Sequence, residues 1–162
     1  MARALIVGCG CHGRGLGAEL RSRGWQVRGT SRGAGIDAIE AAGLEAAVAD
    51  PDRPGTVLEL CGDAAVVVWL LGSASGDAEA VSAIHGSRLE RLLEKLVDTP
   101  VRGFVYEAAG SAPGKDLAAG RRAVEAAGAR WSIPVAVLER ERAVEGWPAE
   151  ATGLAEGVLA RP

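Results

Sequence analysis

Short apolar runs alternate along the chain with stretches in which apolar residues recur every three or four positions. The runs are typical of buried strands and the recurring spacing of amphipathic helices. The predicted strands cover 4–7, 25–30, 44–49, 64–71, 101–106 and 133–138. The predicted helices cover 14–23, 36–42, 56–61, 79–97 and 115–127. Gly24, Gly43 and Gly128 are expected to end three of these helices.

This alternation predicts an α/β fold with one parallel sheet, right-handed crossovers and helices on both faces. Six strands in this rhythm match the doubly wound Rossmann order 3-2-1-4-5-6. The most apolar strand, 64–71, is expected at the centre, and Pro134 favours an edge position for the last strand. Residues 1–139 are predicted to form this domain. Residues 140–162 are expected to add a short helix and a loosely held tail, packed on the same domain or extending from it.

A glycine-rich loop joins the first predicted strand to the first predicted helix. Gly8, Gly10 and Gly13 have the spacing G-x-G-x-x-G, with Cys11 and His12 in the last gap. In such a loop the first glycine permits a tight turn, the second admits a pyrophosphate, and the third lets the helix approach the sheet. The helix N-terminus then offers free amides to the phosphates. The position of the loop favours dinucleotide binding over a glycine-rich turn without a ligand.

The end of the second predicted strand indicates which dinucleotide binds. NAD-binding proteins usually place an acidic residue there to bind the ribose hydroxyls. This chain has Thr30, Ser31 and Arg32 instead. A guanidinium can bind a 2′-phosphate that a carboxylate would repel, and the two hydroxyls can add donors. NADP is therefore favoured over NAD, although an ordinary solvated arginine would also explain Arg32.

Composition excludes several other classes of protein. The chain has 162 residues, 48% of them hydrophobic and 24% charged, which is typical of a globular domain rather than a disordered chain. A net charge of −3 and 4% aromatic residues argue against a nucleic-acid partner. No apolar run reaches the length of a membrane span, and no signal peptide is recognisable, so we expect a cytoplasmic protein. Cys9, Cys11 and His12 are too few for a closed metal site, and no metal is expected.

Over residues 3–75, and more weakly to 139, the sequence resembles atypical and extended short-chain dehydrogenase/reductase proteins. Their relatives include nucleotide-sugar epimerases and NmrA-like NADP sensors. The resemblance is carried by Leu5-Ile6-Val7-Gly8-Cys9-Gly10, Gly13, Leu16, Leu20, Gly24, Val27 and Gly29-Thr30-Ser31-Arg32. It implies that Asp50 lies near the adenine, and that Leu71 and Gly72 belong to a loop that passes the ribose on the nicotinamide side.

The sequence departs from this family in its catalytic residues. Family enzymes use a serine after the fifth strand and a Tyr-x-x-x-Lys pair on the next helix. Here Ala108 and Ala109 follow the strand, and the only tyrosine is Tyr106, on the strand itself. Glu107 with Tyr106 is the best remaining acid/base pair, and His85 is a minor candidate.

The sequence is therefore consistent with two functional hypotheses. The first is a nucleotide-binding sensor or regulatory module, which the missing serine and Tyr-x-x-x-Lys favour. The second is an NAD(P)-dependent oxidoreductase or epimerase-like enzyme with a non-standard acid/base group. A homodimer or another protein partner could complete either one.

Overall fold

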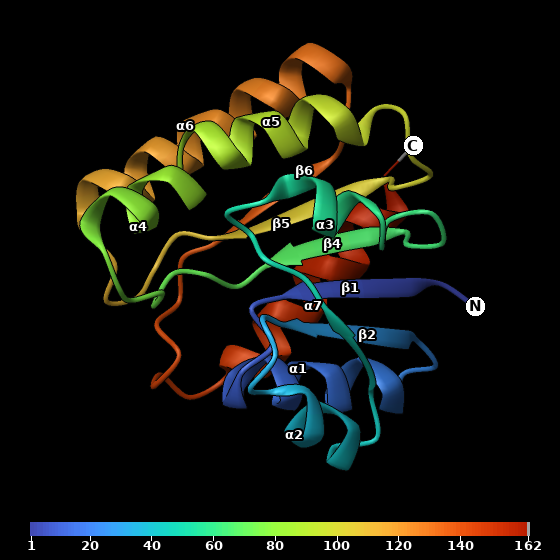
Figure 1. Ribbon diagram of the computed structural model, residues 1–162. Helices are drawn as coiled ribbons and strands as arrows, with labels where there is room; N and C mark the ends of the chain where they lie inside the picture. Colours follow the sequence, from blue (N-terminus) through green and yellow to red (C-terminus); the bar gives the residue numbers. More distant parts are fainter. Residues whose placement is uncertain (162) are drawn as a thin grey trace.

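The core of the molecule is a six-stranded parallel sheet in the order β3-β2-β1-β4-β5-β6 (Figure 1). The computed structural model describes residues 1–161. The strands are β1 Arg3–Val7, β2 Gln26–Ser31, β3 Glu45–Val48, β4 Val66–Trp69, β5 Gly103–Glu107 and β6 Val135–Leu138. The predicted Rossmann order is confirmed, with the apolar strand β4 at the centre and β6 at an edge.

Helices cover both faces of the sheet (Figure 1). They are α1 Cys11–Ser22, α2 Ile36–Ala41, α3 Pro54–Leu58, α4 Ala78–Ile84, α5 Ser87–Leu96, α6 Gly114–Trp131 and α7 Trp147–Ala160. Side chains alternate along each strand between the two layers. Ile6 and Val68 pack with α1 and α7, whereas Leu5 and Val67 pack with α3, α5 and α6. Both faces of the central strands are thus buried, which explains their continuous apolar sequences. Within residues 1–161, no helix is both long and apolar enough to cross a membrane.

The prediction of one helix over 79–97 is wrong, because the chain breaks after Ile84 into α4 and α5. His85 is fully buried, and its ring bonds the backbone of Leu71 and the hydroxyl of Tyr106. Gly86 then takes a non-helical conformation before α5 begins. Apolar residues keep a helical spacing in the sequence across this break, because both helices pack on the same core.

The predicted end of a helix at Gly128 is also wrong. Helix α6 continues to Trp131, and the chain turns at Ser132, whose φ of 57° is left-handed. A Cβ at Gly128 would lie 3.0 Å from a methyl group of Val135. This glycine therefore serves a close helix–strand contact rather than a helix end.

The segment 140–162, for which a short helix and a loosely held tail were expected, contains the 14-residue helix α7 over residues 147–160. Its buried residues Trp147, Ala151, Ala155 and Val158 pack on the face of the sheet that α1 also covers. A Cβ at Gly103 would lie 2.6 Å from Val158, so the helix sits almost directly on β5. Small residues make this contact close, but they produce a weak amphipathic pattern in the sequence.

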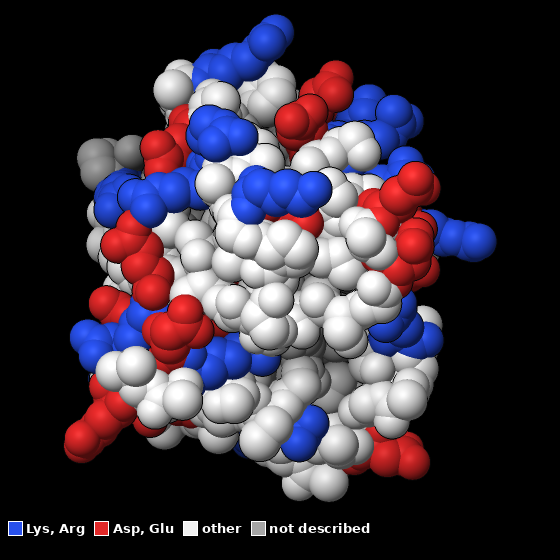
Figure 2. All heavy atoms as spheres, turned by 90° about the vertical axis from the view of Figure 1, so that its left-hand side faces the viewer, with Lys and Arg blue, Asp and Glu red and all other residues white. Residues whose placement is uncertain are grey.

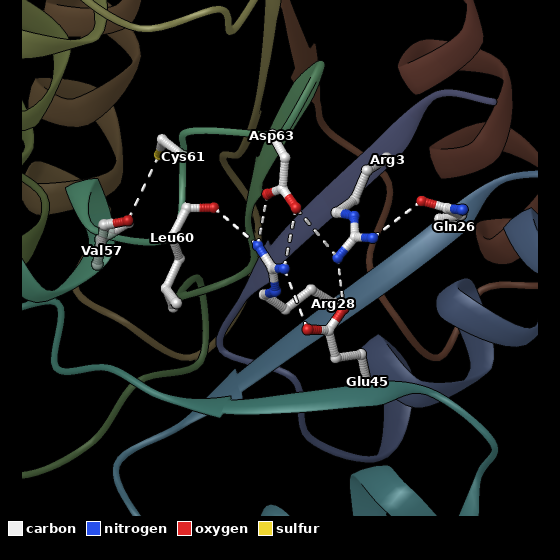
Figure 3. Close-up of polar contacts among 8 residues, drawn as sticks. All are labelled: Arg3, Gln26, Arg28, Glu45, Val57, Leu60, Cys61 and Asp63. Carbon is white, nitrogen blue, oxygen red and sulfur yellow. Dashed lines mark hydrogen bonds and ion pairs between the residues drawn. The ribbon is translucent and has the colours of Figure 1, made fainter.

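Charged side chains pair at the edge of the sheet where the strands begin (Figure 3). Arg28 on β2 binds Asp63 at 2.7 Å and Glu45 at 3.0 Å, and Arg3 on β1 also pairs with Glu45. The hydrogen bond from Arg28 lowers the pKa of the Asp63 carboxyl. These pairs link β1, β2 and β3 at the edge remote from the glycine loop.

Candidate functional site

A cavity of about 390 Å³ opens at the carboxyl ends of the strands. Figure 2 looks onto this edge, where uncharged side chains occupy most of the middle and charged ones lie around the margin. Three segments line the cavity: the glycine loop with Arg14, the ends of β2 and β3, and the end of β4 with α4. Arg142, from the loop before α7, completes the wall. This is the position in which a doubly wound sheet binds its ligand.

The three motif glycines have separate structural roles. Gly8 has φ +85°, and a Cβ there would lie 2.5 Å from the carbonyl oxygen of Leu70. A Cβ at Gly10 would meet no atom within 4 Å, and Gly10 lines the cavity. A Cβ at Gly13 would lie 3.3 Å from Cys9 Sγ. Gly8 and Gly13 therefore permit tight packing, whereas Gly10 leaves space on the ligand side.

The N-terminus of α1 begins at this open glycine and has no side-chain cap. Its first helical hydrogen bond runs from the amide of Arg14 to the carbonyl of Gly10, at 2.8 Å. Three backbone amides lie before this first bonded residue, those of Cys11, His12 and Gly13. Because no helical turn comes before them, they have no helical carbonyl to donate to. The helix thus presents free donors and the positive end of its dipole beside the cavity.

The side chains of Cys11 and His12 lie outside the cavity lining. Both residues are exposed, and the His12 ring packs edge-on against Trp147, with 5.8 Å between ring centroids. Their backbone amides, at the start of α1, are the groups that remain as candidate donors. Cys9 is buried beneath the loop, where a Cβ on Gly29 would lie 2.6 Å from its sulfur, and burial raises the pKa of its thiol to about 11. Among residues 1–161, no three His, Cys, Asp or Glu side chains are grouped to hold a metal ion.

The end of β2 brings Thr30, Ser31 and Arg32 to the cavity wall. Thr30 is buried, and its hydroxyl accepts a 3.4 Å hydrogen bond from the amide of Gly8, so it supports the loop. Ser31 Oγ accepts from two amides of the following turn, at 3.1 and 2.9 Å, and keeps its own proton to donate. Arg32 is exposed, and neither Arg32 nor Arg14 forms an ion pair with another described residue.

The end of β3 contributes an acidic wall. Asp50 lines the cavity and accepts a 3.0 Å hydrogen bond from the amide of Asp52. Asp52 in turn pairs with Arg88 at 3.2 Å. Asp50 is half-buried and keeps carboxylate lone pairs that can accept from a hydroxyl or an amino group.

The end of β4 places Leu71 on the cavity and Gly72 just behind it. The amide of Gly72 donates to Glu107 Oε1 at 2.9 Å. A Cβ on Gly72 would lie 1.9 Å from the carbonyl oxygen of Ala109, so only glycine fits between the ends of β4 and β5. Gly72 therefore supports the cavity without lining it.

The three residues that sequence reasoning considered for proton transfer are all fully buried. His85 Nε2 donates to the carbonyl of Leu71 at 2.9 Å, which leaves Nδ1 to accept from the Tyr106 hydroxyl at 2.6 Å. Burial lowers the pKa of His85 and raises that of Tyr106, so both stay neutral near pH 7. Glu107 forms an ion pair with Arg142, at 2.8 Å. None of the three lines the cavity.

Sequence reasoning missed Arg142 altogether. It lies in a segment rich in charge, where nothing distinguishes it from Arg140 or from the neighbouring glutamates. The only available signal was Glu107, a carboxylate at the end of a buried strand that needs a cationic partner.

Comparisons with known proteins identify the fold. No sequence family and no curated protein matches this chain. Among solved structures, UDP-glucuronic acid 4-epimerase from Bacillus cereus, in complex with NAD, aligns over 85% of this chain and 55% of its own, with 18% identity and a TM-score of 0.68. UDP-glucose 4-epimerase from Brucella ovis, in complex with NAD, aligns over 85% and 51%, with 11% identity and a TM-score of 0.71. WbmH from Bordetella bronchiseptica, in complex with NAD+, aligns over 85% and 55%, with 18% identity and a TM-score of 0.67. The chain thus spans about half the length of these proteins, and over that length it has their Rossmann fold.

Proposed function

We propose that this protein binds NADP(H) in the cavity at the carboxyl edge of the sheet and acts as a nucleotide-binding sensor or regulatory module. The observation that supports this most directly is the uncapped N-terminus of α1 beside Gly10, which has open space on its ligand side. Free amides and the helix dipole favour a phosphate at that point. The ligand's pyrophosphate would lie over Gly10, with the amides of Cys11, His12 and Gly13 as donors.

Charge on the cavity wall supports NADP over NAD. The structures compared above hold NAD, but β2 of this chain ends without a carboxylate. Arg14 and Arg32 both line the cavity and have no acidic partner within residues 1–161, so their guanidinium groups are free to bind a 2′-phosphate. A hydrogen bond to a charged group contributes about 1.5–3 kcal/mol, which corresponds to roughly 10- to 160-fold in affinity. Asp50 would bind on the adenine side.

A non-catalytic role fits a cavity wall that contains no tyrosine, histidine, lysine or glutamate side chain among the described residues. The tyrosine and lysine of the resembling family have no counterpart pair in the sequence, and Tyr106, His85 and Glu107 are buried in contacts with the protein itself. Hydride transfer to a carbonyl needs a proton donor within hydrogen-bond reach of the substrate oxygen.

An NAD(P)-dependent oxidoreductase or epimerase-like enzyme is the second candidate, because two of the three compared structures are UDP-sugar 4-epimerases. The missing acid/base group and substrate contacts would then have to come from a second subunit or another chain.

Titration calorimetry tests the proposal with NADPH, NADP+ and NADH. NADPH should bind at least 10-fold more tightly than NADH, and Arg32→Ala should remove most of that difference. Gly10→Val should abolish binding while the far-ultraviolet circular dichroism spectrum stays unchanged. Gly15→Val is the matched control, since Gly15 lies on α1 outside the cavity and a Cβ there also meets no atom within 4 Å.

Three results would contradict the proposal. Equal affinity for NADPH and NADH would refute the role of Arg32, and unchanged binding by Gly10→Val would place the pyrophosphate elsewhere. Steady oxidation of NADPH with a carbonyl or a sugar nucleotide would refute the sensor hypothesis and support the enzyme hypothesis.

A further inference from the structure

Arg142 is the one cationic side chain that reaches the cavity from the segment between β6 and α7. We propose that its guanidinium binds the carboxamide oxygen of the nicotinamide ring, so that Arg142 determines specificity for the nicotinamide half of the ligand. This inference rests on the proposed binding of NADP(H). It concerns a different end of the cavity from Arg14 and Arg32.

The hydrogen bonds of Arg142 leave one of its nitrogen atoms available. Nε donates to Glu107 Oε2 at 2.9 Å, and Nη2 donates to Glu107 Oε1 at 2.8 Å and to the carbonyl of Leu70 at 3.1 Å. These three bonds use every proton on Nε and Nη2. Nη1 keeps two protons with no acceptor among the described residues, and it lies on the opposite edge of the planar group from Glu107. The side chain is 20% exposed, so a ligand in the cavity can accept from it.

The ion pair with Glu107 decides which chemical group Arg142 can recognise. Glu107 is fully buried and also accepts from the amide of Gly72. Its charge neutralises the guanidinium locally, whereas Arg14 and Arg32 have no such partner. A neutralised guanidinium attracts a further phosphate weakly but still donates well to a carbonyl oxygen. Glu107 is thus a positioning residue, and Arg142 suits a neutral acceptor.

The position of Arg142 corresponds to the nicotinamide half of a bound dinucleotide. In a doubly wound sheet the adenine ribose lies at the end of β2, and the ligand crosses at the point where the strand order reverses. Here that point lies between β1 and β4. Leu70, whose carbonyl accepts from Arg142, directly follows β4, and Leu71 and Ile84 line the same end of the cavity. The second half of the ligand would therefore meet Arg142.

Two ligands that differ only in this half make the test. NADP+ and 2′-phospho-ADP-ribose share the adenosine, the pyrophosphate and the 2′-phosphate, but only NADP+ carries nicotinamide. Removing Arg142 alone would leave the Glu107 carboxylate buried without a partner, which destabilises the fold. The variant is therefore Glu107→Gln with Arg142→Gln, which leaves no unpaired charge. Arg140→Gln is the control, because Arg140 pairs with Glu150 outside the cavity.

The double variant should bind NADP+ about 10-fold more weakly than the unchanged protein does, the loss expected for one hydrogen bond to a charged donor. Its affinity for 2′-phospho-ADP-ribose should change less than twofold, and Arg140→Gln should leave both affinities unchanged. An equal loss for both ligands would mean that the pair only supports the cavity wall, and no loss for either would mean that Arg142 makes no contact. Both results overturn the inference. If the unchanged protein binds neither ligand, the proposed function itself fails, which is a separate outcome.

Discussion

Gly8→Ala should destabilise the protein although it adds a single methyl group. The φ of +85° at Gly8 costs a residue with a Cβ about 1–2 kcal/mol. The methyl group would also lie 2.5 Å from the carbonyl oxygen of Leu70, and overpacking of this kind costs about 1–3 kcal/mol. Reduced entropy of the unfolded chain offsets about 0.4–1 kcal/mol. The net loss in the free energy of unfolding is therefore about 1–4.6 kcal/mol, or roughly 2–18 °C in Tm for a chain of this length.

Urea unfolding followed by circular dichroism at 222 nm measures this loss. Gly10→Ala, two residues away, is the matched control, since its φ is −85° and its Cβ would meet no atom. Its free energy of unfolding should stay within about 0.5 kcal/mol of the unchanged protein. If Gly8→Ala were as stable as Gly10→Ala, the tight turn against β4 would be refuted. The separation of the loop into packing and ligand-facing glycines would then fail with it.

Three further predictions concern the core and the charged edge. Gly120→Ala should lower the free energy of unfolding, measured by urea titration, by about 1–3 kcal/mol, because its Cβ would lie 2.0 Å from the Tyr106 hydroxyl. A variant as stable as the unchanged protein would contradict this close contact. The folded-state pKa of His85 is lowered by burial, so the unfolded chain binds the proton more readily. Stability should therefore fall between pH 7.5 and 5.5, and less so in His85→Gln; equal slopes would exclude His85 as the cause. The pKa of Asp63 is lowered by Arg28, so its contribution is present above pH 3.8 and is lost as pH falls through the folded-state value. Because the Asp63 side chain is 55% exposed, Asp63→Asn should cost less than about 1 kcal/mol at pH 7, and less again in 1 M salt.

The sheet order and the glycine loop could be predicted from the sequence because local rules determine both. Continuous apolar runs that alternate with helices require a parallel sheet covered on both faces, and handedness then leaves few possible orders. A glycine loop between the first strand and the first helix must then lie at the carboxyl end of β1, where the strand order reverses. The pattern also predicted the central position of β4 and the edge position of β6.

Long-range contacts decided the rest. The break between α4 and α5 occurs at His85, whose hydrogen-bond partners lie on other elements. The spacing of apolar residues gives no sign that this polar side chain is buried. Gly128 resembled a helix end because its contact with β6 cannot be seen in the local sequence. Only a short helix could be expected in the segment of α7, because small residues pack closely without a strong amphipathic pattern. Arg142 and Glu107 are 35 residues apart in the sequence and meet only because the loop before α7 crosses the ends of β4 and β5. The spacing of apolar residues indicates which face of a helix or strand is buried. Only the tertiary structure determines which side chains of other elements contact that face.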